Sequence, residues 1–535
     1  MLAFVGLVGL LYLLSVHASA ANSDGATVVL EGKSLRGGDV TLSGWRLSFD
    51  SFWTVDAPFY AIGVAILGVR PVLLHLVPAL IAGLVVTVGA ALAWHGERRR
   101  ARWAGALTVV GLLAFPAHAL AEFFLLGPLH VGTTLWCLLA FAALALARGR
   151  WRVPLAACLL AAGVLGDLQT VALGVVPVLV AGLVAMARRR SWRAGLGGVV
   201  AALGSLALAG VVRLAAMAVG TFRIGPSGRA SVRQMTRNVG LEPGYVARLL
   251  GVGSRGFGTG GAPAGLTAVH FVGLVAVVAA VLAAIGRLVW GAAAGRPGGV
   301  TAGSRRAPGG WVSSRGVIGG SGVLPSGGVV VLDDLLAIAV VGDLAMFAEL
   351  TLTSTDVTFA RYLVPGVIFA AILAGRGVAS ILDRSALSPA VLPAAMAGGA
   401  LLGCLAIGAR GEIAAPLPVQ AQGSLGGFLA AHGLYQGIGD YWTSSIITVD
   451  TREDVTVRPV MADAQGRLEA YDRQSTSAWY LGREFQFLVY DTTEPYDGVD
   501  SSSAAATFGK PSQTYLVGGY EILVWPQPVE VPAGA

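Results

Sequence analysis

Long apolar runs alternate with short polar segments over the first 409 residues or so of the chain. A run of about 20 apolar residues has the length that a helix needs to cross the hydrocarbon core of a bilayer. The pattern predicts eleven transmembrane helices, although residues 153–187 are also compatible with one re-entrant pair. The runs lie at 2–20, 70–94, 103–121, 130–147, 153–167, 169–187, 195–219, 267–289, 329–352, 362–381 and 386–409.

Arginine clusters between the runs predict the orientation. They follow the second, fourth, sixth and eighth runs, at 98–102, 148–152, 188–193 and 296–315. If the spans alternate, these clusters share one face, which the positive-inside rule makes cytoplasmic. The N-terminus is then cytoplasmic and the residues after 410 are extracytoplasmic. Ala18-Ser19-Ala20 resembles a signal-peptidase site, but no Lys or Arg precedes the first run, which favours a retained helix.

The polar segments differ in character. Residues 21–57 and 220–266 are predicted outer loops, and the glycine-rich segment 291–328 is a predicted low-complexity linker on the cytoplasmic side. Residues 411–535 carry acidic, hydroxyl and aromatic side chains in alternating runs, which predict strands at 446–449, 455–458, 485–490 and 520–525. The expected fold is therefore a polytopic α-helical membrane domain, residues 1–409, followed by a small β-rich extracytoplasmic domain, residues 411–535.

Composition supports a membrane protein. Hydrophobic residues make up 55% of the 535 residues and charged residues 13%, whereas soluble proteins carry roughly 25% charged residues. The formal net charge of +7 comes mostly from short arginine clusters between apolar runs, so a nucleic-acid partner is not expected. The three cysteines, Cys137, Cys158 and Cys404, all lie in apolar runs and supply no disulfide framework.

The first outer loop carries the strongest candidate chemistry. Asp39, Asp50 and Asp56 accompany Trp45 and Trp53 just before an apolar segment. A carboxylate at the water–lipid boundary can act as a general base toward an attacking hydroxyl. Tryptophan offers a flat face for a sugar ring, but it is also the usual interfacial anchor. A solvated loop with belt tryptophans is therefore an equal alternative.

Other polar residues fall on the same predicted face. Glu122 and His130 flank the short loop between the third and fourth runs, and Asp167 lies at the turn between the fifth and sixth. These side chains are candidates for lining a substrate site, whereas for Glu122 or Asp167 taken singly a short polar turn is the favoured explanation. His118 follows Pro116 within an apolar run, where a packing role is the more common one.

The second outer loop is rich in arginine where the charge rule expects little. Six arginines stand against one acid, and Arg233 and Arg237 are the candidates for substrate contact. Arginine binds phosphate through two parallel hydrogen bonds, so this loop is a candidate site for a lipid phosphate. Attraction to anionic head groups is the alternative explanation.

Carboxylates also occur inside the ninth run. Asp343 and Glu349 are costly in a membrane and by default suggest function, including a transport path. The following helix begins with Arg361-Tyr362-x-x-Pro365, which can present a cation at the outer interface. In the C-terminal segment, the aromatic residues favour packing over a glycan-binding platform.

Two short motifs resemble the C-type membrane glycosyltransferases, which include protein mannosyltransferases and the aminoarabinose transferase of lipid A. The motifs are Asp56-x-x-x-Tyr60-Ala61 and Arg361-Tyr362-x-x-Pro365, within a similar order of spans. The Asp-Glu pair frequent in that family is absent, because Ala57 follows Asp56. This departure leaves the catalytic aspartate open among Asp39, Asp50 and Asp56.

The resemblance implies an inverting transferase in the plasma (inner) membrane. A polyprenyl-phosphate sugar would bind with its phosphate at Arg361, and a first-loop aspartate would deprotonate the hydroxyl of a glycan, lipid or protein acceptor. No cofactor is certain, and a divalent cation, Mg²⁺ or Mn²⁺, stays open. The alternatives are a multi-pass transporter using the intramembrane carboxylates and a non-catalytic envelope-assembly protein.

Overall fold

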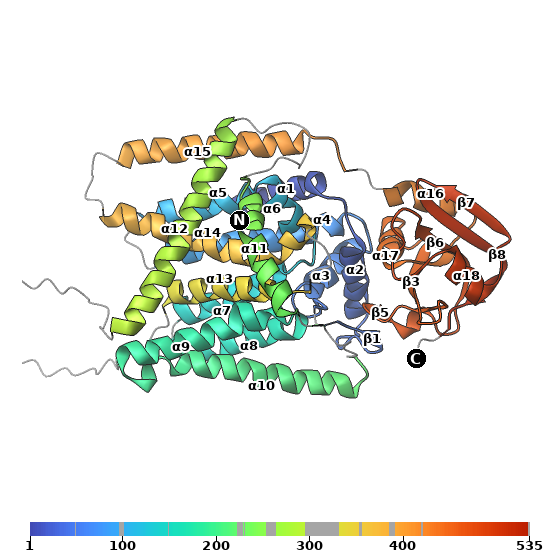
Figure 1. Ribbon diagram of the computed structural model, residues 1–535, viewed down its shortest axis with the longest axis horizontal. Coiled ribbons are helices and arrows are strands. Elements are labelled where there is room, and N and C mark those ends of the chain that lie inside the picture. Colours follow the sequence, from blue (N-terminus) through green and yellow to red (C-terminus); the bar gives the residue numbers. More distant parts are fainter. Residues whose placement is uncertain are drawn as a thin grey trace, which may run out of the picture.

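A computed structural model describes residues 1–48, 50–95, 101–147, 149–221, 228, 230–252, 264–294, 331–351, 356–384, 391–418 and 421–532. Helices form a bundle, and a strand-rich region lies at one end of it (Figure 1). The arginines at 223, 229 and 255 and most of the predicted linker lie outside the described residues.

Each predicted apolar run corresponds to at least one helix. The helices are α1 (Leu2–Ala18), α4 (Leu73–Trp94), α5 (Arg102–Ala114), α6 (His118–Phe124), α7 (Val131–Leu146), α8 (Arg152–Gly166), α9 (Val176–Arg189), α10 (Leu196–Ala218), α12 (Ala264–Ala294), α13 (Leu332–Ala348), α14 (Val364–Arg384) and α15 (Val391–Ile413). A π-helical turn, η1 (Val171–Val175), leads into α9, and the short turns η2 (Trp192–Ala194) and η3 (Val357–Leu363) precede α10 and α14.

Five helical segments in the described part of the chain are long and apolar enough to cross a membrane: Leu73–Trp94, Val171–Arg189, Leu196–Ala218, Leu266–Trp290 and Val357–Asp383. The third predicted run is broken, because α5 and α6 meet at an angle of 83°. Pro116, just before α6, has no N–H to continue the helical hydrogen bonding. The protein is therefore a membrane protein, and the count of eleven spans stays a prediction.

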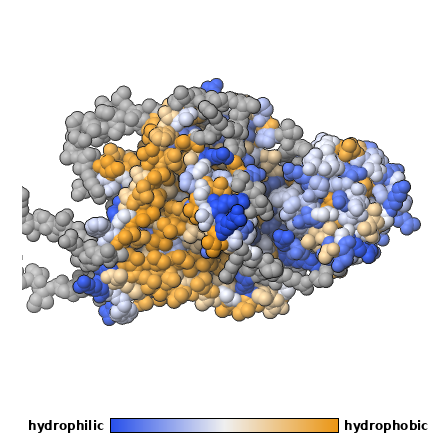
Figure 2. Space-filling view, viewed as in Figure 1, coloured by the Kyte–Doolittle hydropathy of each residue, from blue (hydrophilic) through white to orange (hydrophobic). Residues whose placement is uncertain are grey.

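The surface shows the same division. Apolar side chains cover much of the visible face of the helical bundle, whereas the strand-rich end is mostly polar (Figure 2). On α12, for example, Phe271, Val275 and Leu282 are more than half exposed. A soluble monomer rarely exposes so large a continuous apolar surface, and lipid contact accounts for it.

The outer loops contain helices that the apolar pattern did not predict. Helices α2 (Ser23–Arg36) and α3 (Ala57–Leu67) occupy the first loop and lie between the bundle and the strand-rich end (Figure 1). The Asn22 side chain caps α2 by accepting the Gly25 N–H. In the second loop, α11 (Val232–Leu249) starts with a reciprocal capping box between Ser231 and Gln234.

The C-terminal region contains a six-stranded sheet with the order β4-β3-β2-β6-β8-β7. Strand β2 pairs in parallel with β3 and β6, and the remaining pairs are antiparallel. The elements are α16 (Ala421–Ala431), β2 (Gln436–Gly439), α17 (Tyr441–Asp450), β3 (Thr456–Ala462), β4 (Leu468–Ala470), β5 (Ser475–Thr476), η5 (Ser477–Trp479), β6 (Glu484–Asp491), α18 (Ser501–Phe508), β7 (Gln513–Val517) and β8 (Tyr520–Glu530).

The expected β-rich C-terminal region is confirmed, but one predicted strand is wrong. Strands β3, β6 and β8 overlap the predicted strands at 455–458, 485–490 and 520–525, whereas 446–449 belongs to helix α17. The Asp440 side chain caps this helix by accepting the Thr443 N–H. Residues 443–449 of α17 are all buried, so the sequence shows no polar face that would reveal helical periodicity.

Helix α17 joins the C-terminal sheet to the first outer loop. Ser23 donates to the carbonyl of Trp442 at 2.7 Å, and Thr27 donates to Ser445 at 2.9 Å. Strand β1 (Trp45–Arg46) of the same loop pairs antiparallel with β5. The first loop is thus held on one side by the bundle and on the other by the C-terminal sheet.

Candidate active site around Asp56

The Asp56 carboxylate is buried where the first loop enters α3. Its carboxyl group lies against Gly132 of α7, where an added Cβ would be 2.4 Å from Oδ2. Oδ2 has no hydrogen-bond partner in the described part of the chain. Burial, and then the negative charge of Asp167, raise the pKa of Asp56 well above its usual value. A carboxyl group whose pKa is raised in this way is a stronger base when deprotonated, which suits a general base.

Asp167 is the centre of a buried hydrogen-bond group. Its Oδ2 lies 2.7 Å from Nδ1 of His130 and accepts from the Thr133 hydroxyl at 2.5 Å. Its Oδ1 accepts the backbone N–H of Gln169 at 2.9 Å. The side-chain amide of Gln169 lies 3.1 Å from the other nitrogen of His130. The carboxylate therefore fixes the orientation of the His130 ring, as second-layer carboxylates do in many enzymes.

The His130 ring connects this group to the start of α14. Its centroid lies 5.7 Å from the Phe52 ring and 5.4 Å from the Tyr362 ring. Arg361 donates to the Tyr362 hydroxyl at 3.2 Å, and its Nε is buried with no partner among the described residues. The guanidinium thus keeps donor capacity for an anionic ligand beside the buried carboxylates.

Asp24, on α2, is a site residue that the sequence analysis missed. Its Oδ1 lies 2.5 Å from the Tyr441 hydroxyl, so α17 reaches the edge of the site. Burial raises the pKa of Asp24, while Tyr441 and the nearby Arg361 and His130 act in the opposite direction. Nothing in the local sequence marks Asp24, because its neighbours in space come from α14, α17 and the α7 start.

Glu31 is a second missed carboxylate. It is fully buried in α2, and both of its oxygens have no hydrogen-bond partner in the part of the chain that the structure describes. Burial, followed by the charge of Asp56, raises its pKa well above the usual value. The Tyr60 hydroxyl of α3 is also buried and without a partner among the described residues. The sequence did contain a signal for Glu31, because this charged residue stands in the mostly apolar stretch Thr27-Val28-Val29-Leu30-Glu31-Gly32.

The other first-loop candidates lie in different surroundings. Asp50 is exposed, accepts from Ser48 and contributes to the raised pKa of Asp24. Asp39 accepts the Ser43 N–H within a turn. The geometry therefore separates Asp56 from the two other aspartates, because Asp56 alone of the three is buried beside Asp167.

The two first-loop tryptophans are buried in packing. Trp45 is 2% exposed and meets Trp479 of the C-terminal region edge-on, with ring centroids 5.1 Å apart. Trp53 is 6% exposed and donates its ring N–H to the carbonyl of Val40. Both rings hold the loop in place.

The remaining candidates lie away from this group. Arg233 and Arg237 are exposed on α11. Glu122 is half-buried on α6, on the same helix as His118, which pairs with Glu412 at 2.9 Å.

The carboxylates of α13 have structural partners. Asp343 accepts the backbone N–H of Gly366, in the first turn of α14, at 3.0 Å. At the opposite end of α13, Asp334 pairs with Arg188 and Asp333 pairs with Arg376, each at 2.5 Å. Ion pairing accounts for Asp333 and Asp334. Asp343 keeps one buried oxygen, Oδ1, without a hydrogen-bond partner among the described residues, so it is the carboxylate on which the transport alternative rests.

A metal ion finds no ready set of protein ligands here. Within the described ranges, no three His, Cys, Asp or Glu side chains come together in a way that could hold one.

Comparison with known proteins identifies the fold. No protein-family model and no curated protein sequence matches the chain. Among solved structures, the chain is similar to ArnT from Cupriavidus metallidurans in its apo state, with a TM-score of 0.53 and 12% sequence identity. The match covers 98% of this chain and 97% of that chain. It supports the fold of the C-type membrane glycosyltransferases, which the two sequence motifs suggested, and does not single out a member.

Proposed function

We propose that this protein is an inverting glycosyltransferase that uses a polyprenyl-phosphate sugar on the extracytoplasmic face of the plasma membrane. The observation that carries this proposal is the buried Asp56 carboxylate beside the Asp167–His130 pair, with one oxygen that has no hydrogen-bond partner among the described residues. The fold likeness adds support, because ArnT is an aminoarabinose transferase of the C-type family. The proposed orientation places the N-terminus in the cytoplasm and residues 411–535 outside.

The reaction is a single displacement at the anomeric carbon. Asp56 takes the proton of the acceptor hydroxyl as the acceptor oxygen bonds to the anomeric carbon. The bond from that carbon to the phosphate oxygen breaks, and polyprenyl phosphate leaves with the bonding electron pair. Phosphate is a good leaving group, so the protein mainly supplies position and charge stabilisation.

Arg361 is the proposed phosphate ligand. It lies in η3, the turn that leads into α14, next to Tyr362, and its Nε is free of partners among the described residues. Asp167 and His130 are positioning residues that hold the α7 start, and thereby Gly132, against Asp56. Arg233 and Arg237 on α11 are exposed where they would meet lipid phosphates, and a divalent cation would be shared with the donor.

The first test compares Asp56→Asn with Asp39→Asn in the same loop. With purified protein in nanodiscs, transfer from polyprenyl-phosphate mannose and polyprenyl-phosphate arabinose is measured by release of polyprenyl phosphate. Removing the base is expected to reduce turnover by about 10²–10⁴-fold, whereas the turn residue Asp39 is expected to be dispensable. Full turnover by Asp56→Asn would exclude Asp56 as the base.

The second test concerns the donor phosphate. Arg361→Ala is expected to weaken donor binding, measured by competition with unlabelled polyprenyl phosphate. Arg361→Lys, the matched control, keeps the charge but loses the planar pair of donors, so it is expected to retain an intermediate affinity. Unchanged competition by the alanine variant would remove Arg361 from the donor site.

A further inference from the structure

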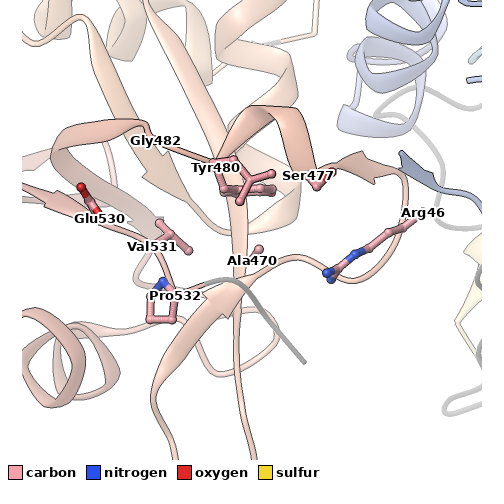
Figure 3. Close-up of a pocket in the computed structure, with 9 residues that line it drawn as sticks. Arg46, Ala470, Ser477, Tyr480, Gly482, Glu530, Val531 and Pro532 are labelled. Carbon is pink, nitrogen blue, oxygen red and sulfur yellow. The ribbon is translucent and has the colours of Figure 1, made fainter. Parts of the chain in front are cut away.

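A cavity of about 380 Å³ lies where the first outer loop meets the C-terminal sheet (Figure 3). It is lined by residues of the 477–482 segment, by the end of β8 and by Arg46 of β1. This volume is at the lower end of the roughly 300–1,000 Å³ typical of small-ligand pockets. It is separate from the Asp56 group, whose residues do not line it.

The side chain of Arg46 points toward the cavity (Figure 3). Its backbone is fixed in a two-stranded pairing opposite Ser475, and its carbonyl accepts the Gln474 N–H at 2.7 Å. Among the described residues, no side chain hydrogen-bonds or ion-pairs with the Arg46 guanidinium. Glu530 lies on the other side and is exposed, which adds carboxylate acceptors.

An aromatic residue forms part of the wall. The Tyr480 side chain is 4% exposed, and its hydroxyl donates to the carbonyl of Pro459 at 2.5 Å, which fixes the ring. Ser477 adds a hydroxyl next to it. Tyr480 is therefore a fixed and largely covered part of the wall, and the exposed apolar surface comes from Leu481, which is 64% exposed, and from Pro532.

The surroundings hold this arrangement rigid. Trp45, the neighbour of Arg46, packs edge-on against Trp479, the neighbour of Tyr480. The Arg458 guanidinium covers the Trp479 ring at 4.4 Å, and burial lowers its pKa to about 10, so it stays charged at neutral pH. This packing fixes the backbone that carries Arg46 and the turn at Ser477–Tyr480, so the entropy lost when a ligand enters is mainly that of the Arg46 and Glu530 side chains.

We infer that this cavity binds a neutral saccharide, as a subsite for a sugar of the acceptor remote from the reacting hydroxyl. Vicinal hydroxyls need donors and acceptors together, which Arg46 and Glu530 supply, and the exposed side chains of Leu481 and Pro532 offer an apolar surface for a face of the sugar. The opposite charges of the two side chains disfavour a ligand with a net charge. This inference rests on the proposed function and narrows the acceptor class to a glycan.

The subsite lies within reach of the reaction centre. Arg46 and Asp56 are ten residues apart, so even a fully extended chain would separate their Cα atoms by no more than about 36 Å. An oligosaccharide of several residues can bridge such a span. The cavity would then hold an acceptor chain while another of its sugars is glycosylated.

The test is direct binding by the full-length protein in detergent. The probes are immobilised neutral oligosaccharides of mannose, galactose, glucose and arabinose, two to six residues long, with uronic-acid oligosaccharides alongside. At least one neutral series is expected to bind, and Arg46→Ala is expected to weaken it about tenfold or more. Glu530→Gln tests whether the carboxylate on the opposite side of the cavity contributes to binding. Arg467→Ala, exposed at the β3–β4 turn and outside the cavity, is the matched control.

Each outcome decides the inference. Lack of binding to every neutral series, binding to acidic probes only, or binding that is equal in the Arg46, Glu530 and Arg467 variants would overturn it. Asp56→Asn is expected to bind the same neutral probes as the unaltered protein. A failure of the proposed transferase activity therefore appears in the turnover assay, whereas a failure of the subsite appears in the binding assay.

Discussion

Replacement of Gly132 by alanine tests the site through a residue that performs no chemistry itself. The added Cβ would lie 2.4 Å from Oδ2 of Asp56 and 2.7 Å from its Cγ, whereas ordinary contacts begin at 3.4 Å. The carboxylate must therefore move by about 1 Å. Displacing a catalytic group by about 1 Å can reduce the rate about 10²-fold, which corresponds to about 2.7 kcal/mol of transition-state stabilisation.

The stability of Gly132→Ala is expected to change little. Alanine favours a helix over glycine by roughly 0.5–1 kcal/mol, which offsets part of the crowding at Asp56. The matched control is Gly210→Ala in α10, where an added Cβ meets nothing within 4 Å. Both variants are expected to keep the thermal unfolding midpoint in detergent, while only Gly132→Ala loses turnover.

The double variant Asp56→Asn with Gly132→Ala tests whether the crowding acts through the Asp56 carboxylate. If crowding acts through the carboxylate, the second substitution adds no loss to the first, because residues that act as a unit are not additive. Normal turnover in Gly132→Ala, measured as release of polyprenyl phosphate, would refute the proposed role of the Asp56 position. If the losses of turnover caused by the two substitutions add in the double variant, Gly132 affects turnover by a route that does not involve the Asp56 carboxylate.

Two more substitutions probe the site and its frame. Asp56 must be deprotonated to act as a base, and the negative charge of Asp167 contributes to its raised pKa. Asp167→Asn is therefore expected to shift the acidic limb of the pH profile of kcat/KM to lower pH. An acidic limb at the same pH in the variant would contradict this coupling between the two carboxylates. Asp343→Ala leaves the Gly366 N–H without its acceptor and is expected to cost about 1–2 kcal/mol in detergent unfolding, whereas Asp343→Asn keeps an acceptor oxygen. Equal stability of both variants would contradict the capping role.

Apolar periodicity predicted the helical segments well, because twenty apolar residues have few other stable arrangements in a chain. It predicted less well where helices lack such runs. Helices α2 and α11 begin at polar caps and are short of apolar residues, and α17 is buried along most of its length. The break between α5 and α6 depends on Pro116, which the hydropathy window averages away.

The candidate site shows a similar division. Asp56, Asp167, His130 and Arg361 were identifiable from the sequence, since charged residues at the ends of apolar runs are few. Their grouping around Gly132 was not, because it depends on contacts among the starts of α3 and α7, the turn after α8 and η3. Asp24 and Glu31 were missed because helix packing, rather than local sequence, buries them.

Local sequence is enough to place the chain in a membrane, to locate its polar segments and to single out the few carboxylates and arginines that need an explanation. These properties follow from composition and from the cost of placing charge in lipid, both of which are local. The tertiary structure alone decided that Asp56, among three first-loop aspartates, is buried beside Asp167, and that Asp343 is a helix cap. Burial and hydrogen bonding depend on segments distant in the chain, so no local pattern records them.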